Sequence, residues 1–184
     1  MYGDLNTYMT FYFICARIKK IHTTYIGRYL MKLIKAFDQH FDITRLIIEN
    51  TIQTIYPYYY PKGAVDFFIA HHSDDAIKTA IIHGEIYLIQ NNNKIVGTGS
   101  IVRNEIKRLF VLPQYQKQGY GTAMMNELEK MIFNDYTEIR LDASLPAYEM
   151  YVHRGYVPIE YHRIKTENGH YLCYHLMKKF HKEL

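Results

Sequence analysis

Hydrophobic and polar residues alternate over residues 31–37, and this period of two predicts a β-strand. Six further short stretches, rich in apolar residues, are also predicted to be strands. Asn91-Asn92-Asn93 and Glu167-Asn168-Gly169 each separate two such stretches, as expected for hairpin turns. The predicted strands span residues 31–37, 85–90, 94–101, 105–112, 139–143, 156–164 and 170–177.

A period near 3.6 predicts helices between these strands. Asp42 is expected to cap the first helix, which ends at Pro57. Shorter helices are predicted at residues 64–71, 74–82 and 147–153. The clearest helix repeats apolar side chains at one-turn spacing: Met124, Met125, Leu128, Met131 and Ile132.

Composition narrows the class of protein. A length of 184 residues and a hydrophobic content of 48% fit one domain with a core of its own. The formal net charge is +4, but four basic residues and one acidic residue in the first thirty contribute most of it, so the remainder gives no basic face for nucleic acid.

Cys15 and Cys173 are far apart in the sequence, which favours a reducing, cytoplasmic setting and argues against a zinc site. Heavy use of Ile, Lys, Asn and Tyr is typical of an AT-rich bacterial genome.

Residues 1–30 differ from the rest of the chain. They show no clear amphipathic period and have too few apolar residues to cross a bilayer. We expect them to be an N-terminal extension, either disordered or preceding a true start at Met31, and we expect residues 31–184 to form the domain.

Gln116-Lys117-Gln118-Gly119-Tyr120-Gly121 follows an apolar run and opens the clearest helix. Two glycines at this spacing let the backbone turn tightly, so that amide N–H groups and the positive end of the helix converge on an anion. The segment therefore predicts a phosphate-binding loop. It has neither the third glycine of a dinucleotide fold nor the Gly-Lys-Ser/Thr ending of a P-loop.

A second block lies downstream: Leu141-Asp142-Ala143-Ser144-Leu145-Pro146-Ala147, followed by Tyr151-Val152-His153-Arg154-Gly155-Tyr156. Together the two blocks resemble the acetyl-CoA motifs of the GNAT acyltransferase superfamily, over roughly residues 31–180. The resemblance implies a mixed α/β fold, with a mostly antiparallel sheet that is splayed between its fourth and fifth strands and flanked by helices.

The resemblance also implies that acetyl-CoA is the co-substrate and that no metal is needed. The arm of acetyl-CoA would pair with the main chain of Phe110, Val111 and Leu112 between the splayed strands. Ser144 stands where many relatives have Asn, and it can still donate one hydrogen bond to the cofactor. Lys117 would either contact the phosphates or remain solvated. The pyrophosphate would be held by Gln116, Lys117, Gln118, Gly119, Tyr120, Gly121 and Thr122.

Transfer to an amine needs a neutral nucleophile, whereas an alkylamine has a pKa of about 10.4. Glu105 precedes Gln116 by eleven residues, where the histone acetyltransferase branch carries its catalytic glutamate, so it is the candidate base. A water relay and a surface carboxylate are the alternatives. Tyr151 stands at the position of the family's general acid, although it could instead pack the helix on the sheet.

Acceptor recognition is expected from the first helices, where the tyrosines 58, 59 and 60 could wall a cleft for an amine or simply pack the link. His71 and His72 point to different sides of a helix and form no ligand set, although one of them could line the acceptor pocket. The glycines of Gly97-Thr98-Gly99-Ser100 are expected to admit a close backbone or substrate.

The sequence thus predicts a bacterial, cytoplasmic, acetyl-CoA-dependent N-acetyltransferase that binds neither nucleic acid nor membrane and that could form a homodimer. Small amines, a protein N-terminus or lysine, and aminoacyl-tRNA remain as acceptors, the last disfavoured by the near-neutral domain. A non-catalytic acyl-CoA-binding module is the alternative from another class.

Overall fold

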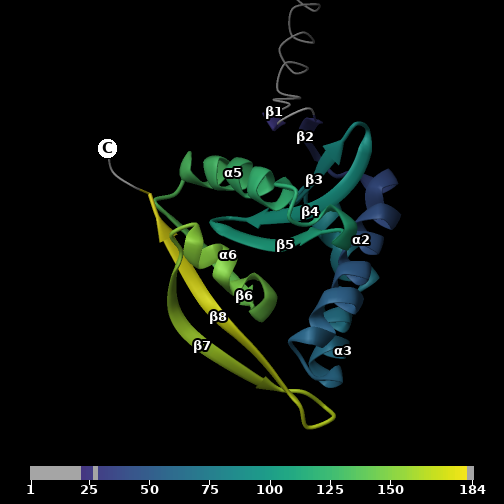
Figure 1. Ribbon diagram of the computed structural model, residues 1–184, viewed down its shortest axis with the longest axis vertical. Helices are drawn as coiled ribbons and strands as arrows, with labels where there is room; N and C mark the ends of the chain where they lie inside the picture. The colour runs from purple at the N-terminus through teal and green to yellow at the C-terminus, as the bar shows by residue number, and fades with distance from the viewer. Residues whose placement is uncertain (1–21, 27–28, 182–184) are drawn as a thin grey trace, which may run out of the picture.

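The computed structural model describes residues 22–26 and 29–181, with side chains from Met31 to His181. The described strands form one sheet in the order β1-β2-β3-β4-β5-β6-β8-β7 (Figure 1). Neighbouring strands are antiparallel except β5 and β6, which are parallel. The strands are β1 (His22–Ile26), β2 (Tyr29–Lys35), β3 (Ile86–Asn91), β4 (Lys94–Val102), β5 (Glu105–Val111), β6 (Glu138–Ser144), β7 (Val157–Lys165) and β8 (Tyr171–Phe180).

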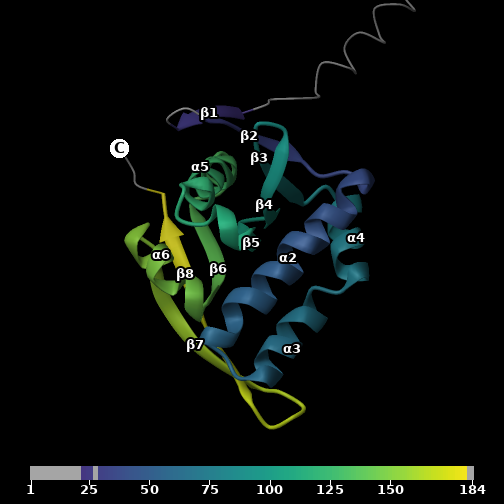
Figure 2. The same ribbon diagram turned by 45° about the vertical axis from the view of Figure 1, so that its right-hand side comes forward.

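Helices cover both faces of this sheet, with α2, α3 and α4 on one side and α5 on the other (Figure 2). The mixed α/β fold class is therefore confirmed. Short 3₁₀ helices flank several of the α-helices. The α-helices are α2 (Phe41–Ile55), α3 (Lys62–His71), α4 (Asp74–Ile82), α5 (Tyr120–Phe133) and α6 (Tyr148–His153), and the 3₁₀ helices are η2 (Asp38–His40), η3 (Tyr56–Tyr58), η4 (Pro113–Tyr115) and η5 (Leu145–Ala147).

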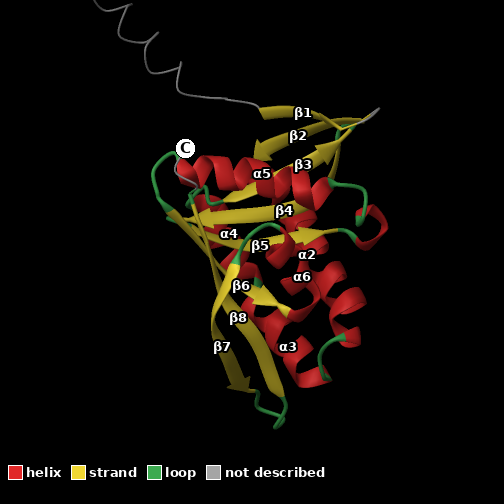
Figure 3. Ribbon diagram, turned by 60° about the vertical axis from the view of Figure 1, so that its left-hand side comes forward, coloured by secondary structure: helices red, strands yellow, loops and turns green. Residues whose placement is uncertain are grey.

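The sheet opens between β5 and β6, the fourth and fifth strands counted from β2 (Figure 3). These two strands are in register only at Glu105 and Arg140. The Arg140 amide donates to the Asn104 carbonyl at 2.9 Å, which closes this end of the gap. Beyond it the strands separate, so their main-chain groups are free of each other, and the predicted splay is confirmed.

Two apolar clusters fill the two faces. The α5 helix buries Met124, Met125 and Leu128 against the sheet, as its one-turn spacing predicts. On the other face α2 buries Ile47, Ile48 and Ile52. Because the clusters lie on opposite faces, α2 and α5 flank the opening between β5 and β6 from both sides.

Three details differ from the expectations. The first helix is preceded by η2 and begins at Phe41 with His40 as its N-cap, so Asp42 lies in the first turn, where its charge suits the helix dipole. Leu46 shares the helical spacing of Ile43, Ile47 and Ile52 in the sequence, which predicts burial, but it is 49% exposed. The strand predicted at residues 31–37 is β2, which begins two residues earlier.

The strand β1 was not predicted, and it lies within residues 1–30, the segment interpreted as an extension. It pairs antiparallel with β2. Residues 1–21 and 27–28 lie outside the described residues. The division of the chain at Met31 therefore stays a prediction.

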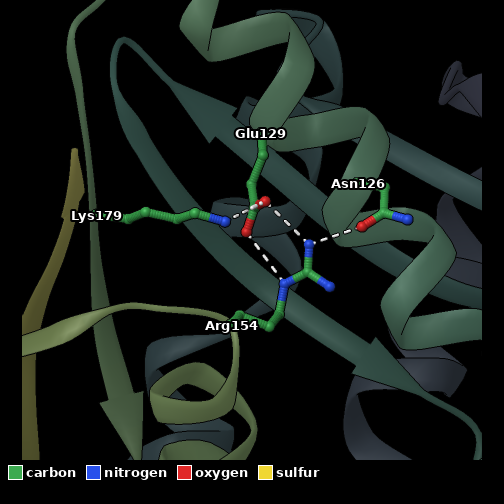
Figure 4. A network of polar contacts seen from close by, with 4 residues as sticks. All are labelled: Asn126, Glu129, Arg154 and Lys179. Atoms are coloured by element: carbon green, nitrogen blue, oxygen red, sulfur yellow. Dashed lines mark hydrogen bonds and ion pairs between the residues drawn. The ribbon is translucent and has the colours of Figure 1, made fainter. Parts of the chain in front are cut away.

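A buried carboxylate ties α5 to the C-terminal half (Figure 4). Glu129, only 7% exposed, accepts hydrogen bonds from the Arg154 guanidinium at 2.9 and 3.1 Å and from Lys179 Nζ at 2.8 Å. Arg154 also donates to Asn126 Oδ1 at 2.8 Å. The network therefore joins α5, the end of α6 and β8.

None of the described helices has the length and apolarity needed to cross a membrane. Within residues 31–181, no three His, Cys, Asp or Glu side chains gather in a way that could hold a metal ion.

Candidate active site

A cleft of about 930 Å³ lies at the opening between β5 and β6. Its walls include Thr51, Phe68, Glu105, Gly121 and Tyr151, residues that are far apart in the sequence. The lining comes from α2, η3, α3, β5, the loop before α5, β6, α6 and the β7–β8 hairpin. The fold thus brings most of the predicted site residues to one cavity.

The predicted phosphate-binding loop forms one end of this cleft. Gly119 is the N-cap of α5 with φ of 88°, a left-handed conformation that favours glycine. The first internal bond of the helix runs from the Ala123 amide to the Gly119 carbonyl, and the N-cap Gly119 has no side chain to cap the first turn. Amides of the first turn are therefore directed at the cleft, where an anion can bind them.

Gly121 lines the cleft in the first turn of α5. A Cβ atom at this position would meet nothing nearer than Val111 Cγ2 at 3.9 Å, an ordinary contact. Packing alone therefore does not require glycine here, whereas a ligand lying against the helix terminus does. The residues present fit a pyrophosphate.

The other loop residues divide into two groups. Lys117 and Thr122 line the cleft together with Gln116, whose Nε2 donates to the Val111 carbonyl at 2.9 Å. Gln118 instead donates to the Gln114 carbonyl at 2.8 Å, and Tyr120 is buried against Tyr115. Gln118 and Tyr120 therefore brace the loop.

Main-chain groups at the end of β5 alternate in direction. The Leu112 amide donates to Val96 on β4 at 2.9 Å, and the Phe110 carbonyl lies against Gly97 on the same strand. The Val111 groups consequently face the opening. Its carbonyl already accepts from Thr51 and Gln116, so the Val111 N–H is the main-chain group directed at the cleft.

The tyrosines that follow α2 have different surroundings. Tyr58 and Tyr59 line the cleft and are 83% and 51% exposed. Tyr60 is 5% exposed; its hydroxyl donates to the Cys173 carbonyl at 2.9 Å and accepts from the Leu145 amide at 2.7 Å. Tyr60 therefore packs the link, whereas its two neighbours wall the cleft.

Ser144 lies at the end of β6 and lines the cleft, and its Oγ is 3.1 Å from the Tyr56 hydroxyl. Burial raises the pKa of Tyr56 to about 12, an effect that the hydrogen bond to Ser144 partly offsets. When the Tyr56 hydroxyl donates this bond, the Ser144 hydroxyl can still donate to a ligand.

Tyr151 lines the cleft from α6 and is only 5% exposed. Burial raises its pKa well above the usual range, and the neighbouring Tyr56 adds to this effect. Its ring also packs edge-on against Tyr156, with centroids 5.6 Å apart. The phenol thus stays protonated at neutral pH, as a proton donor must, and the residue lines the cleft.

Two carboxylates face the cleft. Glu105 Oε2 is 2.9 Å from Lys107 Nζ on the same strand. Asp142, on β6, was not predicted; burial and then the nearby charge of Glu105 raise its pKa. Asp142 lies within the second block of the sequence, but nothing in the sequence indicated that it would line the same cleft as Glu105.

The glycines of β4 admit close neighbours, as expected. A Cβ on Gly97 would meet the Phe110 carbonyl at 2.9 Å, and one on Gly99 would meet Leu128 and Met124 at 2.9 Å. Gly97 therefore admits backbone, whereas Gly99 admits the side chains of α5.

Comparison with known proteins agrees with this geometry. A family described as "Acetyltransferase (GNAT) domain" matches residues 55–179. A GCN5-related N-acetyltransferase structure from Rhodopseudomonas palustris is similar with a TM-score of 0.73 and 24% identity, over 81% of this chain and 94% of that one.

Two further structures have the same fold. The PaiA N-acetyltransferase from Thermoplasma acidophilum, in complex with coenzyme A, matches with a TM-score of 0.61 and 15% identity, over 82% of this chain and 99% of that one. The ribosomal-protein-S18-alanine N-acetyltransferase from Escherichia coli matches with a TM-score of 0.61 and 16% identity, over 84% and 96%. A search of curated proteins found no match.

Proposed function

The chain belongs to the GNAT acetyltransferase family, and from this premise we propose that it transfers the acetyl group of acetyl-CoA directly to an amine. One observation carries the proposal: the N-terminal turn of α5, Val111 and Tyr151 all line a single cleft. Acetyl-CoA supplies an activated acyl group as its thioester.

Binding would use the loop and the strand edge. The first-turn amides of α5, with Gln116, Lys117 and Thr122 beside them, would hold the pyrophosphate. The Val111 N–H would pair with the thioester arm in the opening, and Ser144 would donate one hydrogen bond to the cofactor. These roles rest on main-chain groups more than on side chains.

Proton transfer would use groups on facing walls. Glu105 would accept the proton of the incoming ammonium, directly or through water, while Lys107 holds its carboxylate in place. Asp142 faces the same space, and its raised pKa makes it a second carboxylate able to take that proton. Tyr151 would donate its proton toward the departing sulfur.

The acceptor would enter along the tyrosine wall. Tyr58 and Tyr59 offer ring faces and hydroxyls to an amine, whereas Tyr60 would act only through the packing of that wall. The proposed location is a bacterial cytoplasm, and the chain could form a homodimer. The proposed acceptor is a small molecule or a protein amine.

Calorimetric titration of acetyl-CoA into the full chain tests the proposal. We expect micromolar binding that Gly119→Glu abolishes, because that substitution places a bulky negative charge at the loop. Absence of binding in a folded sample would refute the proposed function. In turnover assays Glu105→Gln should lose the pH dependence of a carboxylate base, and a profile equal to that of the wild type would remove Glu105 from this role.

A further inference from the structure

The strand β5 carries a bulge at the centre of the cleft. Ser100 of β4 pairs with Lys107 and Thr98 pairs with Phe110, so Gly99 alone stands opposite Arg108 and Leu109. Arg108 has φ of 52°, a left-handed conformation that is unfavourable for a side chain of this size. Such backbone outliers cluster at active sites and ligand-binding sites, where the surrounding structure holds the strained conformation in place.

The bulge changes which way the side chains point. Ile106 and Leu109 both pack in the cluster beneath α5, although strict alternation would place them on opposite faces. Lys107 and Arg108, which lie between them, both line the cleft, and their charges act on His71 at the end of α3, on the other face of the sheet. The extra residue therefore adds a second cation to the cleft wall.

The two cations differ in their partners. Lys107 pairs with Glu105 at 2.9 Å, so its charge is matched. Arg108 makes no ion pair with a described carboxylate, and its Nε is buried without a hydrogen-bond partner. The side chain is half-buried, and burial lowers the pKa of Arg108 although the charge of Glu85 opposes this effect. A buried guanidinium N–H without an acceptor is costly, so its position favours an anion supplied from outside the chain.

Two histidines, His71 and His72, line the same cleft as Arg108. His72 Nδ1 is also buried without a partner, and the His71 and His72 rings lie edge to face at 5.1 Å. Burial lowers the pKa of His72 to about 3, with the charges of His71 and Arg108 contributing, so His72 is neutral at pH 7. Near this end of the cleft, Arg108 therefore contributes a positive charge that no described carboxylate neutralises by a direct ion pair, although the charge of Glu85 acts on it.

We propose that Arg108 binds a carboxylate of the acceptor, so that the acceptor is an amino acid or a similar compact amine carrying a carboxylate. This deepens the proposed function and rests on it. A single carboxylate balances the single charge of Arg108, whereas a doubly charged phosphate would exceed it. Arg108 is three residues from Glu105, about 10 Å along a strand, so a small molecule can reach both.

Matched probes test this in the full-length protein. The common protein amino acids and their primary amides share the side chain and differ in the carboxylate, and thiol release from acetyl-CoA reports their acetylation. Because the amide also has the lower amine pKa, each kcat/KM is calculated for the neutral amine. We expect at least one acid to exceed its amide by about tenfold or more in kcat/KM, the size of one charge-assisted hydrogen bond. Arg108→Gln should remove this preference, and Arg108→Lys should restore part of it.

Two controls separate the outcomes. Arg163→Gln, which alters an exposed arginine outside the cleft, should keep the preference, and Arg108→Gln should keep the wild-type affinity for acetyl-CoA. Amides acetylated as well as acids, no acid acetylated at all, a preference that survives Arg108→Gln, or phosphoethanolamine preferred to every acid would each overturn the inference. A wild-type protein that fails to bind acetyl-CoA would instead refute the proposed function itself.

Discussion

Tyr151 is buried and lines the cleft, and this leads to a kinetic prediction for a single hydroxyl group. Tyr151→Phe should lower kcat by about 10²- to 10³-fold, the range of a general acid, while acetyl-CoA affinity stays near that of the wild type. Because burial raises the pKa of Tyr151, its titration should cause no alkaline loss of activity below about pH 10 in the wild type. Steady-state rates of thiol release across pH measure both effects.

Tyr148→Phe is the matched control, since Tyr148 lies on the same helix and packs against His175 outside the cleft lining. It should leave kcat unchanged. Equal turnover in Tyr151→Phe and the wild type would assign Tyr151 to packing.

A second prediction at the scale of one residue concerns the stability and the acetyl-CoA affinity of a Gly121 variant. Gly121→Ala should leave the free energy of unfolding unchanged or raise it slightly, because the new methyl group meets only Val111 at 3.9 Å and alanine favours helix. It should weaken acetyl-CoA binding at least about tenfold, because the methyl group enters the space of the pyrophosphate. Urea unfolding and calorimetry measure the two quantities.

Gly97→Ala provides the contrast, since its methyl group would lie 2.9 Å from the Phe110 carbonyl and should destabilise the fold. Unchanged cofactor affinity in Gly121→Ala would mean that the phosphates lie elsewhere.

At the scale of elements, the sequence predicted the helices and strands that have regular apolar spacing, but it did not predict the bulge that interrupts this spacing in β5. The α5 helix and the β3–β4 hairpin follow from apolar spacing and turn residues, and both are confirmed. The bulge in β5 could not be predicted, because period two places Arg108 on the face of Ile106. One extra residue reverses that assignment, and only the pairing with β4 reveals it.

The network around Glu129 yields a prediction at the same scale. Glu129→Gln should lower the free energy of unfolding by about 2–3 kcal/mol, because Arg154 and Lys179 lose the anion that compensates their partial burial. Urea unfolding followed by circular dichroism measures the change.

Glu138→Gln is a suitable comparison, since Glu138 also contacts two cations, Arg140 and Lys178, but its side chain is 27% exposed. Its loss should stay below about 1 kcal/mol, as for surface ion pairs. Equal losses for the two variants would show that the burial of Glu129 adds nothing.

At the scale of the whole molecule, the sheet consists of two parts held together at one end of β5 and β6. The motifs located both walls of the cleft in the sequence, but they could not show what keeps the walls at a fixed separation. That depends on contacts between residues about a hundred positions apart. Tyr60 makes two of them, to Leu145 after β6 and to Cys173 on β8, so the tyrosine-rich link braces the C-terminal part against α2 and α3.

Removing that brace should loosen one wall of the cleft. Tyr60→Phe leaves the Leu145 amide and the Cys173 carbonyl without their partner, which should lower the free energy of unfolding by about 1–3 kcal/mol. Hydrogen exchange should accelerate at Leu145 and in β8 near Cys173 more than in β3 and β4, and acetyl-CoA binding should weaken. Tyr59→Phe removes a hydroxyl from the exposed wall and should change neither stability nor exchange. If both variants exchange like the wild type, the two parts of the sheet are held by the β5–β6 junction alone, and Tyr60 only fills space.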